Sequence, residues 1–295
     1  MKIHHIFLIL CFLPKFEACG ESVTSENSCR IQKRETERIN RGKNVMLGHH
    51  PWLVKIRFSD GATCTGTIVS EKFILTAKHC IKPRAAPKFI FYGHVHTSEM
   101  NTIKVKNHFY SGSDIRIKNG HIGTDLALLE LVKPLKFSET VGPICLSKTG
   151  RMMENETAII AGFGVAFSSA VFRGKPPSEF VVVPDHNIIS FHVAEAQSNC
   201  VKHLPGSECK SVQESEFCAG GQNTGTATGD SGGPLMIYRN GRWIQSGITA
   251  RGRLFIKKDA EQGYIIFDKG IYTDISKFCD WIEKTTKQNV LCSEN

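Results

Sequence analysis

Ser231 lies in the run Gly229-Asp230-Ser231-Gly232-Gly233-Pro234, whose glycines permit a tight backbone that exposes the hydroxyl and the neighbouring amides. A serine hydroxyl is a weak nucleophile unless a base takes its proton and an acid orients that base. The chain supplies both upstream, in Thr76-Ala77-Lys78-His79-Cys80 and in Thr124-Asp125-Leu126. The order His79, Asp125, Ser231 is one of three unrelated orders known for the same catalytic geometry.

Three further fragments accompany these motifs in the same order: Gly48–Val54, Phe217–Gly220 and Gly270–Thr273. Together the six fragments resemble the chymotrypsin/trypsin family of secreted serine endopeptidases, from about Ile39 to the C-terminal helix. The resemblance implies an all-β fold of two six-stranded antiparallel barrels packed together, with a cleft between them.

The family's catalytic roles transfer to matching residues. Ser231 is the expected nucleophile, His79 the proton carrier and Asp125 the group that orients the imidazole. The backbone N–H groups of Gly229 and Ser231 are the expected oxyanion hole. The implied activity is hydrolysis of protein or peptide substrates through an acyl-enzyme. The alternative is a catalytically weak or inactive homologue that acts as a secreted binding protein, and the intact triad argues against it.

The run Arg38-Ile39-Asn40-Arg41-Gly42 resembles the family's activation site. Cleavage after Arg38 by an activating protease would free the amino group of Ile39, which in the family pairs with the aspartate before the nucleophile, here Asp230. Asn40 and Arg41 depart from the usual Val and Gly.

By the same resemblance, Gly225 lies at the base of the primary specificity pocket, with Gly252 and Gly270 on its walls. A preference for Arg or Lys needs a carboxylate at the base, and Gly225 has none. We therefore expect a large apolar or aromatic substrate side chain. Acidic residues placed in a nearby loop are the other source of charge; they are Asp259, Glu261 and Asp268.

Three further residues in the cleft depart from the family pattern. Ala250 replaces a serine whose hydroxyl helps to hold the triad aspartate, Arg251 replaces a tryptophan that flanks the substrate, and Lys78 replaces a small residue. Lys78 and Arg251 could act on the site in two ways: by favouring acidic substrate residues, or by opposing the charged form of His79. The alternative is that both side chains extend into solvent.

The 295-residue chain is 41% hydrophobic, which is enough for a large core. Residues 1–18 read as a signal peptide, whose apolar run Ile6–Leu13 is too short to span a bilayer. Residues 19–38 form a polar pro-segment, and residues 39–295 the protease domain. Eleven cysteines fit an oxidising compartment, so we expect a secreted, extracellular protein.

Short apolar runs alternate with turns from residue 51 onward, which is typical of an all-β sandwich or barrel. A helical spacing of Phe278, Trp281, Ile282 and Thr285 predicts one short helix near the end.

The resemblance implies the disulfides Cys64–Cys80 and Cys200–Cys218. It also places Cys145 where family members tether a pro-segment, with Cys29 or Cys19 as its partner. The pairing of the remaining cysteines stays open.

The net charge of +9 is compatible with weak binding to anionic glycans. The sequence has no dense Lys/Arg run, so we expect no nucleic-acid partner. Asn155-Glu156-Thr157 is an N-glycosylation sequon. The histidine pairs His49-His50 and His94-X-His96 have no third convergent ligand, so we expect no metal, and no cofactor. We expect a monomer whose other partners are an activating protease and a protein inhibitor.

Overall fold

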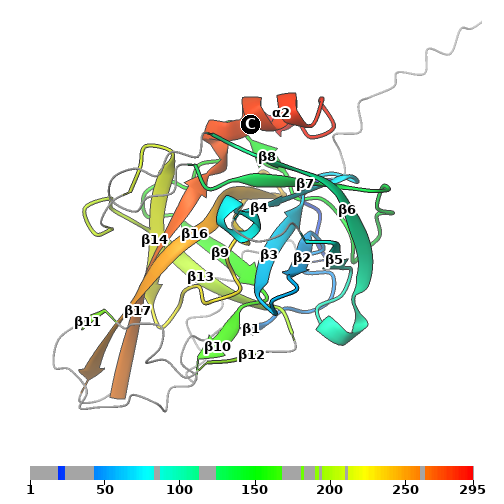
Figure 1. The fold of residues 1–295 in the computed structure, drawn as a ribbon. Helices are drawn as coiled ribbons and strands as arrows, with labels where there is room; N and C mark the ends of the chain where they lie inside the picture. The colour runs from blue at the N-terminus through cyan, green and yellow to red at the C-terminus, as the bar shows by residue number, and fades with distance from the viewer. Residues whose placement is uncertain are drawn as a thin grey trace, which may run out of the picture.

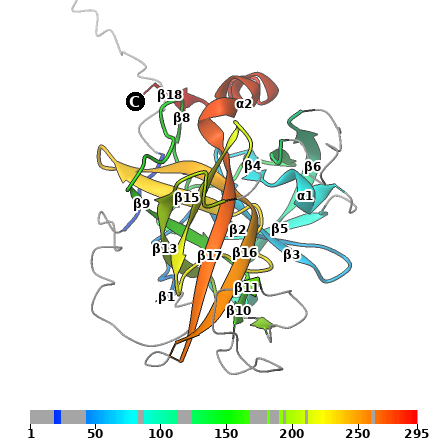
Figure 2. The same cartoon turned by 90° about the vertical axis from the view of Figure 1, so that its left-hand side faces the viewer.

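The computed structural model describes residues 19–23, 43–82, 87–112, 124–167, 181–182, 190–192, 195–209, 212–259 and 263–294. Figures 1 and 2 show two β-barrels side by side, with the C-terminal helix at one end and a long two-stranded ribbon at the other.

The first barrel comprises six antiparallel strands in the order β2-β3-β4-β7-β6-β5, and it closes through the pairing of β2 with β5. Its strands are β2 (Leu53–Arg57), β3 (Thr63–Ile68), β4 (Phe73–Thr76), β5 (Phe89–Tyr92), β6 (Asn101–Tyr110) and β7 (Ala127–Leu131).

The second barrel closes in the order β13-β14-β17-β16-β15-β9, again with antiparallel pairs, because β9 pairs with β13. Its strands are β9 (Thr157–Gly162), β13 (Gln197–Leu204), β14 (Glu216–Gln222), β15 (Pro234–Arg239), β16 (Arg242–Asp259) and β17 (Gly263–Asp274). The prediction of two six-stranded antiparallel barrels is confirmed.

The remaining elements are short. Further strands are β1 (Lys43–Asn44), β8 (Leu146–Ser147), β10 (Val165–Phe167), β11 (Val181–Val182), β12 (Ser190–His192) and β18 (Cys292–Ser293). The helical segments are α1 (Lys78–Ile81), η3 (Thr97–Glu99), η5 (Ile275–Phe278) and α2 (Cys279–Thr285), and the last two form the predicted C-terminal helix. No helix in the described ranges has both the length and the apolar composition needed to cross a membrane.

One cluster of buried apolar side chains includes residues of both barrels, and two smaller clusters lie apart from it. Strand β4 reads Phe-Ile-Leu-Thr and is buried throughout. Trp52, immediately before β2, is fully buried, and its Nε1 lies 3.0 Å from Sδ of Met236 in β15. This contact ties the first barrel to the second.

Four disulfides join described cysteines. Cys64–Cys80 is confirmed, and Cys145 pairs with Cys19, one of its two predicted partners. The pairs that the sequence did not assign are Cys279–Cys292 and Cys209–Cys218.

The predicted bond Cys200–Cys218 is wrong, because Cys218 bonds Cys209. In the β13–β14 ladder the residue opposite Cys218 is Leu204, four positions beyond Cys200. At about 3.3 Å per residue, Cys200 is roughly 13 Å along the strand from that position, well beyond the Cα separation of about 7 Å that a disulfide can bridge. Cys200 is itself disulfide-bonded, to another cysteine.

The Trp52 contact predicts a large stability effect at the junction of the barrels. Replacing Trp52 by Ala should lower the free energy of unfolding by about 3 to 5 kcal/mol, because a fully buried aromatic side chain leaves a cavity. Urea denaturation measures this. The control Phe137→Ala removes an exposed ring and should cost less than about 0.5 kcal/mol; equal losses in the two variants would contradict the account.

Candidate active site

His79 and Asp125 are held together by two hydrogen bonds. His79 lies in the short helix α1, and Asp125 lies two residues before β7, which pairs with the strand leading into that helix. The ring atom Nδ1 of His79 is 2.6 Å from Oδ2 of Asp125, and the His79 backbone N–H donates to Oδ1 at 2.8 Å. The Asp125 residue is buried, whereas the His79 side chain is 25% exposed and therefore accessible to a reactant.

Ser231 lies in the segment 223–233 between β14 and β15, here called the nucleophile loop. Thr65 of β3, which is fully buried, fastens this loop to the first barrel. The Thr65 backbone N–H donates to the carbonyl of Ser231 at 2.9 Å, and its hydroxyl donates to the carbonyl of Gly229 at 2.9 Å.

Gly232 makes this close approach to the first barrel feasible. Its φ is +82°, and a Cβ at this position would collide with the hydroxyl of Thr76 and the carbonyl of Thr65. Its N–H donates to the carbonyl of Thr249 in β16 at 2.8 Å. The tight turn predicted from the glycines therefore holds Ser231 against both barrels.

The disulfide Cys64–Cys80 lies between the histidine and the serine loop. Sγ of Cys80 is 3.9 Å from Nε2 of His79 and 3.6 Å from the carbonyl oxygen of Ser231. Within the described residues no hydrogen bond joins Nε2 of His79 to the Ser231 hydroxyl. Such bonds are often long before substrate binds.

The backbone N–H groups of Gly229 and Ser231 donate no hydrogen bond to any acceptor in the part of the chain that the structure describes. The neighbouring amides of Asp230 and Gly233 are engaged: the N–H of Asp230 donates to the carbonyl of Ala227 at 3.0 Å, and that of Gly233 donates to the carbonyl of Asp230 at 2.8 Å. Two unused amides beside the serine can stabilise an anionic oxygen.

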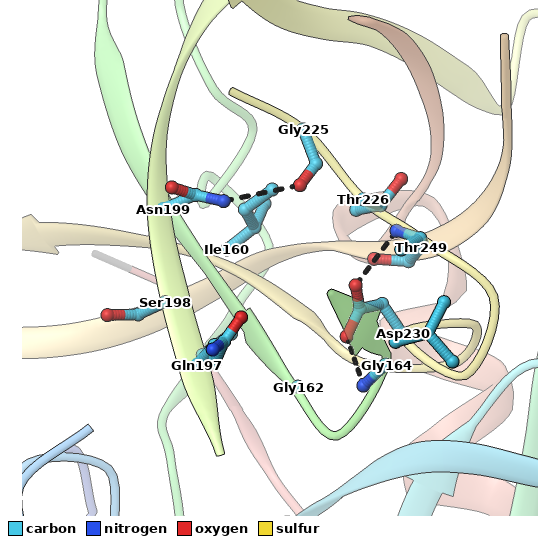
Figure 3. A pocket seen from close by; sticks show the side chains of 13 residues that line it. Ile160, Gly162, Gly164, Gln197, Ser198, Asn199, Gly225, Thr226, Asp230 and Thr249 are labelled. Carbon is cyan, nitrogen blue, oxygen red and sulfur yellow. Dashed lines mark hydrogen bonds between the residues drawn. The ribbon is translucent and has the colours of Figure 1, made fainter. Parts of the chain in front are cut away.

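Asp230 faces a cavity on the other side of the loop, lined in part by Gly164, Gln197, Ser198 and Thr226 (Figure 3). Its carboxylate accepts hydrogen bonds from the N–H of Gly164 at 2.8 Å and that of Ala227 at 2.9 Å. Protein atoms enclose the carboxyl group although the residue keeps some exposure through the cavity. This burial raises the pKa of Asp230 to about 6, and the two backbone hydrogen bonds oppose the rise.

Gly225 differs from its sequence-based description. The sequence predicted an uncharged pocket base at Gly225 and left Asp268 as one other source of charge; the side chain of Asp268 fills the space that a Cβ on Gly225 would take. Asp268 is 1% exposed and belongs to strand β17, not to a loop. The pocket walls Gly252 and Gly270 face each other across the β16–β17 ladder.

The two cations at the cleft do not simply extend into solvent. Lys78 is 2% exposed. The guanidinium of Arg251 pairs with the buried carboxylate of Glu216, with N–O distances of 2.5 and 2.8 Å. Glu216, which the sequence analysis did not single out, therefore compensates the charge of Arg251. Ala250 is buried and offers Asp125 no hydroxyl.

Comparison with known proteins assigns the family. The family model described as Trypsin matches residues 39–282. The chain belongs to the trypsin family. It is similar to Ovochymase of Halocynthia roretzi, with 28% identity over 94% of this chain, and it spans 17% of the length of that protein.

In this trypsin-family chain, one group of described residues has metal-ligand atoms close together: Cys64, His79 and Cys80, within 4.8 Å. Both sulfurs belong to the disulfide, so neither offers the thiolate that a metal needs. His50 is buried beside Trp52 and Trp243, and burial lowers its pKa to about 3. A neutral, enclosed ring of this kind packs against the tryptophans.

Several predicted features lie outside the described residues: the signal peptide 1–18, most of the pro-segment, Arg38, Ile39, Cys29 and Glu261. Asn155 is described, and it is exposed in a turn with φ +62°. Its glycosylation stays a prediction.

The raised pKa of Asp230 predicts a pH-dependent stability. A carboxyl whose pKa is raised by folding stabilises the folded chain below its ordinary value of 3.8, and this contribution is lost as pH rises through about 6. Relative to Asp230→Asn, the wild-type chain should lose about 2 to 3 kcal/mol of unfolding free energy over that range.

Urea denaturation at several pH values measures that difference. The missing acceptor in the asparagine variant adds an offset that does not depend on pH. Asp280→Asn, at an exposed aspartate in α2, is the control and should follow the wild-type curve. Parallel curves for the wild type and Asp230→Asn would contradict the assigned pKa.

Proposed function

We propose that this chain is a secreted serine endopeptidase that cleaves peptide bonds through an acyl-enzyme. The observation that supports it most is the hydrogen-bonded pair His79–Asp125 beside the loop that carries Ser231. Membership of the trypsin family makes protein and peptide substrates the natural class.

The chemistry follows from these positions. The Ser231 hydroxyl attacks the peptide carbonyl, and Nε2 of His79 takes the proton and passes it to the leaving amine. Asp125 holds the Nδ1–H and stabilises the charged ring. The developing oxyanion accepts hydrogen bonds from the amides of Gly229 and Ser231, each worth roughly 3 kcal/mol in the transition state. Water, activated by His79, then releases the acyl group.

The proposal includes activation by cleavage after Arg38. Lys43, four residues beyond Ile39, pairs in β1 with Ser198, which lines the cavity at Asp230. Four residues span up to roughly 13 Å, which is long enough for the new amino group of Ile39 to enter the cavity that Ser198 and Asp230 both line. A buried carboxylate gains much from a cation, because an unpaired ion is costly in low dielectric.

Secretion and the partners are part of the same proposal. The disulfides fit an oxidising compartment. An activating protease, a protein inhibitor and weak retention on anionic glycans stay predictions, as does a monomeric state. The apolar primary specificity expected from Gly225 alone has no support, since the Asp268 side chain lies against this glycine.

The competing function is a catalytically weak or inactive homologue that captures ligands in its cleft. Two observations favour it: His79 makes no hydrogen bond to the Ser231 hydroxyl among the described contacts, and Ala250 cannot brace Asp125. Loss of one supporting hydrogen bond costs about 1 kcal/mol, which slows an enzyme without stopping it. Active-site labelling separates the two functions.

Covalent labelling tests the nucleophile directly. After cleavage at Arg38, a small organophosphorus probe should modify Ser231, and mass spectrometry of the peptide locates the adduct. Asp125→Asn should reduce the rate of peptide hydrolysis by about 10⁴-fold, because the imidazole loses its orienting partner. Ser59→Ala, at an exposed serine, is the matched control and should leave labelling unchanged. No adduct on the cleaved wild-type chain would leave the binding homologue as the better account.

The variant Arg38→Gln tests activation. It should be secreted and folded but show at least about 100-fold less labelling than the cleaved wild type, since Asp230 then lacks the Ile39 ammonium. Pairing raises the pKa of that amine, so activity of the cleaved chain should fall as pH rises through the raised value. Full activity in the uncut variant would refute activation at this site.

A further inference from the structure

The carboxyl group of Asp268 has unused hydrogen-bonding capacity although it is buried. Oδ2 accepts from the N–H of Thr226 at 3.1 Å, but Oδ1 is buried with no hydrogen-bond partner. Most buried polar atoms in proteins are paired, so an orphaned carboxylate oxygen calls for an explanation.

Two nearby cations of the same strands are engaged elsewhere. Lys269, the next residue, faces the opposite side of β17 and lies 3.4 Å from Oε2 of Glu208. Arg251 pairs with Glu216. Among the described residues no lysine or arginine forms an ion pair with Asp268, and the ionised form of a buried carboxylate is costly until a cation pairs with it.

Gly225 and Asp268 fit each other. Gly225 has φ +138°, and a Cβ there would collide with Cβ, Cγ and Oδ2 of Asp268. The absent side chain at the pocket base is therefore what makes room for a carboxylate from the neighbouring strand. Gly225 carries no charge itself, but its lack of a side chain leaves room for the carboxylate of Asp268 from β17.

The oxygen Oδ1 faces the space beside Gly252, which is exposed at the surface. A Cβ on Gly252 would lie 3.3 Å from Oδ1 of Asp268 and 3.5 Å from the hydroxyl of Thr226. The hydroxyl of Tyr272, beside Gly270, is a second buried oxygen without a partner. These three oxygen atoms, from Asp268, Thr226 and Tyr272, lie beside glycines that have no side chains. Such a group of acceptors suits a ligand that carries several N–H donors.

The electrostatics agree with this geometry. Burial raises the pKa of Asp268 to about 7, with a smaller contribution from the charge of Asp230. Burial, with the charges of these two aspartates, also raises the pKa of Tyr272. A cation that enters this site would favour the ionised carboxylate.

We propose that Asp268 is the specificity-determining residue of this site and selects substrates with a lysine or arginine side chain before the scissile bond. This inference rests on the proposed protease function. The ammonium or guanidinium group pairs with Oδ1 of Asp268 and donates to the Thr226 hydroxyl. Gly252 and Gly270 leave space for the aliphatic part of the side chain.

The kinetic test uses the full chain cleaved after Arg38 and peptides that differ only in the residue before the scissile bond. Lysine or arginine peptides should give a kcat/KM at least about 10-fold above phenylalanine or leucine peptides. Asp268→Asn should reduce kcat/KM for the basic peptides by about 100-fold or more, because a buried charge loses its partner. The control Asp280→Asn should change nothing. Faster cleavage of the apolar peptides by the wild type, or an unchanged preference in Asp268→Asn, would overturn the proposal.

A binding test separates this inference from the proposed function, because it needs no catalysis. The fluorescent cation p-aminobenzamidine should bind cleaved Ser231→Ala and should lose its affinity when Asp268→Asn is added. It should also raise the melting temperature of the cleaved wild-type chain, whereas the neutral analogue benzamide should not. Such binding in a chain that cleaves no peptide supports the Asp268 site and refutes only the protease function. Equal effects of the two compounds on the wild type would overturn the site, even if Asp268→Asn failed to fold.

Discussion

Thr65 carries the contact on which the active-site geometry depends, because it joins a strand of the first barrel to the serine loop of the second. One buried residue binds the carbonyls of both Ser231 and Gly229, and its hydroxyl also accepts from the N–H of Phe163 at 3.0 Å. Its own carbonyl accepts from the hydroxyl of Thr76, three residues before His79. The serine loop and the segment leading to the histidine are thus bonded to the same residue. Movement between the barrels would break several hydrogen bonds at once, which is how a site divided between two barrels keeps its geometry.

Buried acids are the second constraint. Asp230 belongs to the nucleophile loop and Asp268 packs against the same loop at Gly225, and burial raises the pKa of each. Each carboxylate receives backbone hydrogen bonds but no cation from the described chain. The folded chain therefore holds two acids whose charged forms are unfavourable until a positive group arrives. In our account the Ile39 amino group meets the first acid and a substrate side chain meets the second, so activation and recognition use the same electrostatics.

The sequence predicted an all-β fold from short-range patterns, and the family resemblance added the two six-stranded barrels that the structure shows. The glycines around Ser231 and the order of His79, Asp125 and Ser231 lie in compact motifs, and alternating apolar runs indicated many short strands. Errors arose where strand register decides the outcome. Cys200 and Cys209 both precede Cys218, and only the β13–β14 register shows which of them reaches it.

The charge of the pocket at Gly225 could not be predicted from local sequence either. The charge at this position depends on a side chain 43 residues away, which the β16–β17 ribbon brings against it. The sequence named Asp268 as one of three possible sources of charge but placed it in a loop, and only its position in the buried part of β17 brings it against Gly225. The ion pair of Arg251 with Glu216 likewise joins residues that are distant in sequence, so no local pattern reveals it.

The most direct test of the central claim is a crystal structure of the cleaved chain after reaction with a small organophosphorus inhibitor. Our account predicts a covalent bond from phosphorus to Oγ of Ser231, with a phosphoryl oxygen about 3 Å from the amides of Gly229 and Ser231. Nε2 of His79 should lie within hydrogen-bond distance of the adduct, while Nδ1 still bonds Asp125. An unmodified Ser231, or an imidazole turned away from the adduct and from Asp125, would contradict the account.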